Sequence, residues 1–198
     1  MKKDIILSGV GGQGILSIAA IIGFAALERI LFIKQSEVHG MSQRGGAVQS
    51  HLRISDSEIA SDLIPYGEAD LIISVEPMES MRYLPFLSKE GWIITNTTPF
   101  VNIPNYPDLN QLLEQLNSYG NVIAFNADEV ARKIKAPKAS NVVTLGAASP
   151  FLEIPIENLK GGIKTLFGRK GDEIINMNIN ALLAGVEESK RFTGKTEV

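Results

Sequence analysis

Six residues near the start of the chain, Gly9-Val10-Gly11-Gly12-Gln13-Gly14, fit the pattern G-x-G-x-x-G. Glycines at this spacing allow a tight turn and let backbone N–H groups approach an anion, and the N-terminus of a following helix adds a partial positive charge. The motif lies between a predicted strand, residues 5–7, and a predicted helix, residues 15–29. We expect this glycine loop to contact a ligand or a partner, although glycines there also permit tight strand–helix packing without a ligand. Its candidate binding residues are Gly9, Gly11, Gly12, Gln13 and Gly14.

A second constellation, Glu37-Val38-His39-Gly40-Met41-Ser42-Gln43-Arg44-Gly45-Gly46, is polar and rich in glycine. Three glycines and many polar side chains would support the interior of a strand or helix poorly, so we expect a loop. It follows the second predicted strand, residues 30–33, which places it at the carboxyl edge of a parallel sheet, near the glycine loop. Arg44 could present its planar donors to a phosphate or carboxylate there. Alternatively, Arg44 pairs with Glu37 in an ordinary surface loop, where His39 only forms hydrogen bonds.

Two further predicted strands also end in polar residues. Glu76-Pro77 follows the predicted strand over residues 69–75, and Asn96-Thr97-Thr98-Pro99 follows the one over residues 92–95. Because these ends lie on the same carboxyl edge, they fit a site or a subunit interface, and simple helix capping explains them equally well.

The elements that position these loops alternate between short apolar strands and helices over the first two thirds of the chain. This alternation is typical of a mostly parallel sheet covered on both faces. From residue 141 onwards, three helical stretches follow without a clear strand. The prediction is a three-layer, Rossmann-like α/β fold, with helices on both faces of a mostly parallel sheet and a helical C-terminal extension. We expect a single domain over residues 1–198, with a core over about residues 1–140 and the extension over about residues 141–198.

Composition narrows the chemistry. The 198 residues include no cysteine, which excludes disulfides, a cysteine nucleophile and an iron–sulfur cluster ligated in the usual way by this chain. With only two histidines, a catalytic zinc site is not expected either, and we predict no metal site. The net charge of −3 gives no footprint for nucleic acid. No apolar run is long enough to span a bilayer, and no signal peptide is evident, so we expect a cytoplasmic protein without a membrane partner.

The two loops together carry a resemblance. The sequence G-V-G-G-Q-G followed about 25 residues later by E-V-H-G-M-S-Q-R-G-G resembles the gamma-type chain of the 2-oxoacid:ferredoxin oxidoreductase family. The form H-G-M-S-Q-R-G-G is most similar to the beta subunit of the indolepyruvate type. D-L-I-I-S-V-E-P at residues 70–77 and N-V-V-T-L-G-A at residues 141–147 extend the resemblance over nearly the whole chain.

The resemblance implies a subunit of an oxidoreductase that converts aryl 2-oxoacids to acyl-CoA by oxidative decarboxylation, with ferredoxin as electron acceptor. It also implies that thiamine diphosphate and iron–sulfur clusters lie on a large partner subunit and that this chain carries no cofactor of its own. The glycine loop would face the partner or a cofactor. The polar edge of the shared site would comprise Ser42, Gln43 and Arg44, and no residue receives a catalytic role. We expect the isolated chain to be inactive and to associate as a two-fold dimer.

Two other functions remain open at this stage. A self-contained dinucleotide-binding oxidoreductase would use the same glycine loop and place Glu37 on a ribose. A structural partner without any ligand would use the glycines for packing alone. The sequence leaves open which 2-oxoacid is used, the stoichiometry of the complex, and whether coenzyme A or thiamine diphosphate touches this chain.

Overall fold

A six-stranded sheet forms the centre of the protein in the computed structural model, which describes residues 1–39, 45–101 and 103–194. Its strands follow the order β2-β3-β1-β4-β5-β6. The strands are β1 (Lys2–Val10), β2 (Phe32–His39), β3 (Ala47–Ser55), β4 (Ala69–Ser74), β5 (Leu87–Asn96) and β6 (Val122–Phe125). Strands β1, β4, β5 and β6 pair in parallel, whereas β3 runs antiparallel between β1 and β2. The predicted mostly parallel α/β sheet is confirmed.

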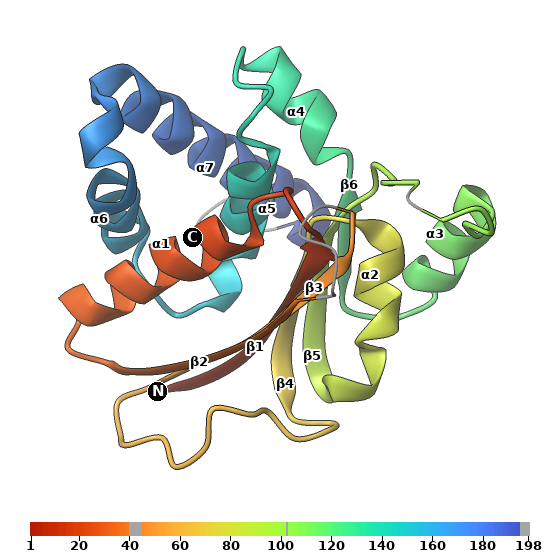
Figure 1. The fold of residues 1–198 in the computed structure, drawn as a ribbon, viewed down its shortest axis with the longest axis horizontal. Coiled ribbons are helices and arrows are strands. Elements are labelled where there is room, and N and C mark those ends of the chain that lie inside the picture. Colours follow the sequence, from red (N-terminus) through yellow and green to blue (C-terminus); the bar gives the residue numbers. More distant parts are fainter. Residues whose placement is uncertain (40–44, 102, 195–198) are drawn as a thin grey trace.

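Helices cover both faces of this sheet (Figure 1). One layer contains α1 (Ile15–Glu28), α4 (Ala127–Lys133), α5 (Ser140–Ala148), α6 (Ile156–Phe167) and α7 (Asp172–Thr193). The opposite side carries α2 (Pro77–Arg82) and α3 (Leu109–Asn117). Short 3-10 turns complete the chain at Leu84–Phe86, Ser149–Phe151 and Gly168–Lys170.

The sheet strands alternate their side chains between two apolar clusters, as a strand period of two requires. The larger cluster joins Ile5 and Leu7 of β1 to Ile21 of α1, Val143 of α5 and Leu182 of α7. The smaller one joins Ile6, Ile64, Ala69, Ile72 and Tyr83 on the other face. The C-terminal helices therefore share one core with the strands, and the predicted division at about residue 140 stays a prediction.

The second strand differs from its prediction. We expected residues 30–33 to be the strand and residues 37–46 to be a loop, but β2 spans Phe32–His39 and includes Glu37. It pairs with β3 from Phe32 opposite Ser55 to His39 opposite Val48. As the outermost strand of the sheet, β2 has its backbone supported by this pairing while polar side chains such as Lys34 and Gln35 are exposed, so a polar sequence can form a strand here.

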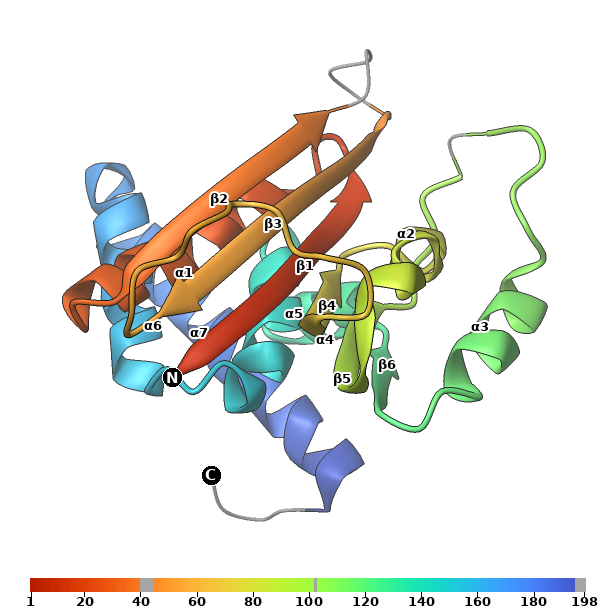
Figure 2. The same ribbon diagram turned by 90° about the horizontal axis from the view of Figure 1, so that it is seen from below.

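The segment between β3 and β4, residues 56–68, crosses the face of β2, β3 and β1 that lies opposite α1 (Figure 2). Buried His51 on β3 holds this segment, because its Nδ1 accepts a hydrogen bond of 3.0 Å from the backbone N–H of Ile64. The side-chain amide of Gln49 lies 2.6 Å from His51 Nε2. Burial lowers the pKa of His51. The charge of Arg53 lowers this pKa further, whereas the charge of Asp62 acts against the shift. The imidazole is therefore neutral in the fold.

We expect His51 to make the protein less stable as the pH falls. An unfolded histidine with a pKa of about 6.5 takes up a proton that the folded imidazole resists, so the free energy of unfolding decreases as the pH drops below about 6.5. Urea unfolding at about pH 7.5 and about pH 5.5 measures the change. The variant His51→Gln should be less stable at the higher pH and show a flatter pH dependence. Parallel pH profiles for the two proteins would contradict this role.

Among the described helices, none has both the length and the apolar character needed to cross a membrane.

Candidate functional site

The two glycine-rich segments of the sequence meet at the carboxyl edge of the sheet. The N–H of Gly11 donates to the carbonyl oxygen of Gly46 over 2.8 Å, and the N–H of Gly45 donates to the carbonyl oxygen of Gly11 over 3.4 Å. The glycine loop and the end of the β2–β3 connection are therefore held side by side by their backbones. Their expected proximity is confirmed at these residues. Ser42, Gln43 and Arg44 lie outside the described residues.

The glycine loop is fixed closely on two sides. A Cβ on Gly9 would lie 2.4 Å from Cγ2 of Val75, at the end of β4. Gly14 has a φ of +82°, which favours glycine, and a Cβ there would lie 2.5 Å from Nδ2 of Asn141. The same Asn141 Nδ2 donates a 3.0 Å hydrogen bond to the carbonyl oxygen of Gly14. Packing against β4 and α5 thus accounts for two of the glycines.

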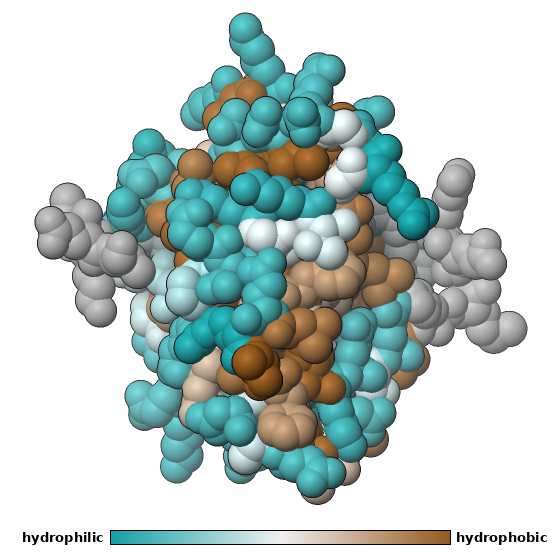
Figure 3. Space-filling model, turned by 90° about the vertical axis from the view of Figure 1, so that its left-hand side faces the viewer, coloured by the Kyte–Doolittle hydropathy of each residue, from teal (hydrophilic) through white to brown (hydrophobic). Residues whose placement is uncertain are grey.

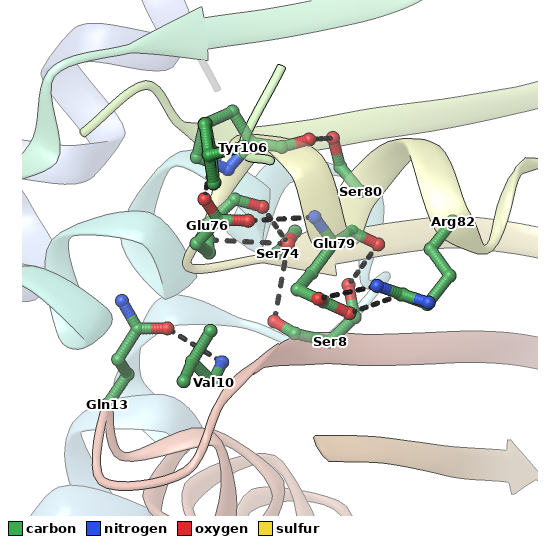
Figure 4. A network of polar contacts seen from close by, with 10 residues as sticks. Ser8, Val10, Gln13, Ser74, Glu76, Glu79, Ser80, Arg82 and Tyr106 are labelled. Carbon is green, nitrogen blue, oxygen red and sulfur yellow. Dashed lines mark hydrogen bonds and ion pairs between the residues drawn. The ribbon is translucent and has the colours of Figure 1, made fainter. Parts of the chain in front are cut away.

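Gln13 braces the loop from within (Figure 4). Its Oε1 accepts a 2.8 Å hydrogen bond from the N–H of Val10, and its Nε2 donates to the carbonyl oxygen of Val75 over 3.4 Å. The Gln13 amide lies between the ends of β1 and β4. This is the topological switch point of the sheet, because β2 and β3 lie on one side of β1 and β4 to β6 lie on the other. Because ligands bind at such a switch point in open α/β sheets, Gln13 shapes the floor of the candidate site.

Cavities lie on both sides of the glycine loop. One, of about 280 Å³, is lined by Val10, Gly11, Gly12, Gly14, Ile15, Leu16 and Val48 and is mainly apolar. The other, of about 300 Å³, includes Gly12, Gln13, Ser17 and the exposed lysines Lys138 and Lys170. The lysines and the first turn of α1 can favour an anionic group on that side, while the apolar side suits a hydrocarbon or aromatic group. Sequence reasoning missed both lysines, because no local pattern connects them to the loop.

The polar end of β4 serves capping and bracing (Figure 4). Fully buried Glu76 caps α2 by accepting a 2.8 Å hydrogen bond from the N–H of Glu79. Its Oε1 also accepts from the N–H of Phe100 over 3.3 Å and from the hydroxyl of Tyr106. Burial and the bond to Glu76 raise the pKa of Tyr106, so its hydroxyl stays protonated and donating. Glu76 therefore ties the chain after β5 to the sheet edge.

Two further carboxylate groups, Glu79 on α2 and Asp128 on α4, lie beside the polar strand ends. Buried Glu79 is paired with Arg82 at 3.0 Å, and burial raises the pKa of Glu79 against the opposing effect of Arg82. At the end of β5, Nδ2 of Asn96 donates a 2.9 Å hydrogen bond to Asp128, and its Oδ1 accepts a 3.0 Å hydrogen bond from the N–H of Ala127. These contacts favour the capping and bracing interpretation of the polar strand ends.

The strand order bears on the dinucleotide alternative. A ribose-binding carboxylate belongs at the end of the strand next to β1, but β3 separates β2 from β1 here. Glu37 lies opposite Ser50 of β3, and Ser50 lies opposite Leu7 of β1, which places Glu37 two strand spacings, about 10 Å, from β1. This strand order therefore does not favour the dinucleotide alternative, in which Glu37 would bind a ribose beside the glycine loop.

Metal-binding capacity is absent from what the structure describes: no group of three or more His, Asp or Glu side chains there could hold an ion. With no cysteine in the sequence, the residues present do not fit an iron–sulfur cluster.

Comparison with known proteins gives consistent matches. Residues 4–188 match the family model described as pyruvate ferredoxin/flavodoxin oxidoreductase. The indolepyruvate oxidoreductase subunit IorB of Methanothermobacter thermautotrophicus is 38% identical over 192 residues, covering 93% of this chain and 96% of that protein. Pyruvate oxidoreductase subunit PORC of Thermotoga maritima shares the fold with a TM-score of 0.71 at 22% identity, covering 94% of this chain and 96% of that one. The 2-oxoglutarate:ferredoxin oxidoreductase of Magnetococcus marinus gives a TM-score of 0.74 at 20% identity, covering 96% of this chain and 31% of that chain.

Proposed function

Because the chain belongs to the pyruvate ferredoxin/flavodoxin oxidoreductase family, we propose that it is the small, gamma-type subunit of an indolepyruvate-type 2-oxoacid:ferredoxin oxidoreductase. The family resemblance expected from the sequence is confirmed. The observation that carries the proposal is the 38% identity to an IorB subunit, which extends over nearly the full length of both chains.

In the proposed reaction, the complex removes the carboxylate of an aryl 2-oxoacid as CO₂. The remaining acyl group forms a thioester with the sulfur of coenzyme A, and the two electrons released pass to ferredoxin. Thiamine diphosphate and iron–sulfur clusters supply the decarboxylation and electron-transfer chemistry when they are bound. We assign these cofactors to a large partner subunit, as the family resemblance implies, and the absence of cysteine from this chain agrees with that assignment for the clusters. In the Magnetococcus enzyme, the matching fold makes up 31% of a longer chain, which supports a need for further protein around this domain.

The part of this chain that we place against the shared site is the pair of joined loops. The glycine loop supplies Gly9, Gly11, Gly12, Gln13 and Gly14, and the β2–β3 connection supplies Ser42, Gln43 and Arg44. Support comes from the backbone hydrogen bonds between Gly11 and Gly45–Gly46, which fix the end of the second segment beside the first. The role of this chain is to position and enclose, and none of its residues receives a catalytic role.

Reconstitution tests the proposal. The purified chain should be colourless and unable to reduce a viologen dye from indolepyruvate, because it lacks cysteine ligands for a cluster. Adding the large subunit should produce indolepyruvate- and coenzyme A-dependent dye reduction above that of the large subunit alone. Pyruvate and 2-oxoglutarate serve as control substrates for the indolepyruvate assignment. Iron–sulfur absorbance or turnover by the isolated chain would contradict the division of labour between the subunits.

A further inference from the structure

Ile30 has a backbone conformation that suits glycine. Its φ is +57°, in the left-handed region that a β-branched residue rarely occupies. The position ends α1: the N–H of Ile30 donates to the carbonyl oxygen of Leu27 over 3.0 Å, and the N–H of Leu31 donates to that of Ala26 over 3.1 Å. Glycine is the usual residue at such a helix end. The hydrogen bonds explain the left-handed turn, and they do not explain why isoleucine occupies it.

The side chain of Ile30 contributes little to the fold of a single chain, because it is 91% exposed. Leu27, at the end of α1, is 60% exposed, and Phe32, at the start of β2, is 49% exposed. We name Leu27, Ile30 and Phe32 the corner patch. Hydrophobic residues gather on the face of the molecule that contains this corner (Figure 3). Single exposed apolar residues are common on monomers, but three within six positions, one of them in a strained conformation, indicate an interface.

An apolar groove adjoins the corner patch through Arg29, the residue before Ile30. The groove has a volume of about 570 Å³ and runs between α7 and the chain that leads into α6. Arg29 forms part of its wall and donates from Nη1 to the carbonyl oxygen of Glu153 over 2.7 Å. Apolar side chains and prolines line it, among them Pro150, Ile154, Pro155, Ile156, Leu183 and Val186.

The charged side chains that line the groove balance one another, because Arg29 and Lys190 are cationic and Glu153 and Glu187 are anionic. Glu187 pairs with Lys190 at 3.0 Å. An occupant of the groove therefore needs apolar side chains and no net charge. A copy of the same surface also meets no net charge repulsion here.

We propose that the corner patch and this groove form the interface of a two-fold dimer, in which the patch of each copy packs into the groove of the other. The chain itself carries the exposed apolar side chains that the groove requires, and the two features adjoin at Arg29. In a two-fold interface both copies use the same surface, which must be complementary to itself. A surface that carries both a patch and a groove meets this requirement, because each patch can enter the groove of the other copy. Burial of Ile30 in the dimer then offsets the strain of its left-handed backbone.

The variant Ile30→Gly separates association from folding, because the two properties move in opposite directions. Glycine relieves the left-handed strain, so the melting temperature of the dilute protein should rise by about 2–4 °C. Each dimer loses two isoleucine side chains from its interface, so the dissociation constant measured by sedimentation should increase at least about tenfold. Leu183→Ala, in the groove, should also weaken the dimer.

Lys135→Gly is the matched control. Lys135 is exposed, has a φ of +58° and follows α4, outside the patch and the groove. It should gain similar stability without any change in the dissociation constant. The proposal is overturned if the wild-type chain is monomeric at about 100 μM, or if Ile30→Gly associates as strongly as the Lys135→Gly control and the wild type. It is also overturned if the large subunit, rather than a second copy, is the only species whose binding depends on Ile30. Dye reduction by the reconstituted complex reports on the proposed function separately.

Discussion

Replacing Gly146 with alanine is expected to lower the melting temperature by about 6–12 °C. Helices α5 and α7 cross at this point with their backbones in near contact. A Cβ on Gly146 would lie 2.0 Å from the carbonyl oxygen of Leu182 and 3.0 Å from Cα of Gly185. Because the obstructing atoms belong to the backbone, the helices must separate, and we expect a loss of about 3 kcal/mol in the free energy of unfolding. Thermal unfolding followed by circular dichroism measures this change.

The facing glycine should behave in the same way. A Cβ on Gly185 would lie 2.0 Å from the carbonyl oxygen of Val143. Once one alanine has separated the helices, the second meets less resistance, so Gly146→Ala and Gly185→Ala together should cost less than the sum of the two. Gly23→Ala is the control, because Gly23 lies within α1 with no neighbouring atom within 4 Å of its added Cβ. That change should raise the melting temperature by a few degrees, since alanine favours a helix over glycine by about 1 kcal/mol. Equal effects at positions 23 and 146 would disprove the close packing.

Several elements could be predicted from the sequence because their apolar residues are continuous. Leu71-Ile72-Ile73 forms the centre of β4, buried on both faces, as such a run predicts. Small residues at Gly146-Ala147-Ala148-Ser149 permit the close packing of α5 on α7 that the contacts of Gly146 show. The β2 strand was only partly predicted, since its polar residues, including Glu37, obey the looser requirements of an edge strand.

The candidate site could be predicted as a place but not as a set of contacts. The carboxyl ends of β1 and β2 share one sheet edge, and this suffices to predict that Gly11 and Gly46 lie close together. The hydrogen bond between Asn141 and Gly14 joins residues 127 positions apart, and no local pattern encodes it. Likewise, the sequence made Gln13 a candidate for ligand contact but did not predict its hydrogen bonds to Val10 and Val75. These bonds depend on how closely β4 approaches the loop.

Arg44→Ala is expected to reduce turnover of the reconstituted complex at least about tenfold. Arg44 itself lies outside the described residues, but Gly45 and Gly46, which follow it, are bonded to the glycine loop. In our proposal its guanidinium binds a carboxylate or phosphate at the shared site, or an acidic group of the partner. Loss of one charge-assisted hydrogen bond costs roughly 1.5–3 kcal/mol, which corresponds to about 10- to 150-fold in the equilibrium that it supports.

Two further variants distinguish a binding role from a general loss of charge. Lysine keeps the charge but cannot form the paired donor geometry of arginine, so Arg44→Lys should restore only part of the activity. Arg191→Ala removes an exposed arginine paired with Glu188 at the end of α7, and turnover should be unchanged because such surface pairs contribute little. The isolated Arg44→Ala chain should melt within a few degrees of the wild type, which shows that its fold is intact. If the Arg44→Ala complex turns over as fast as the wild type, Arg44 is not part of the shared site. The proposed site on this chain would then rest on the glycine loop alone.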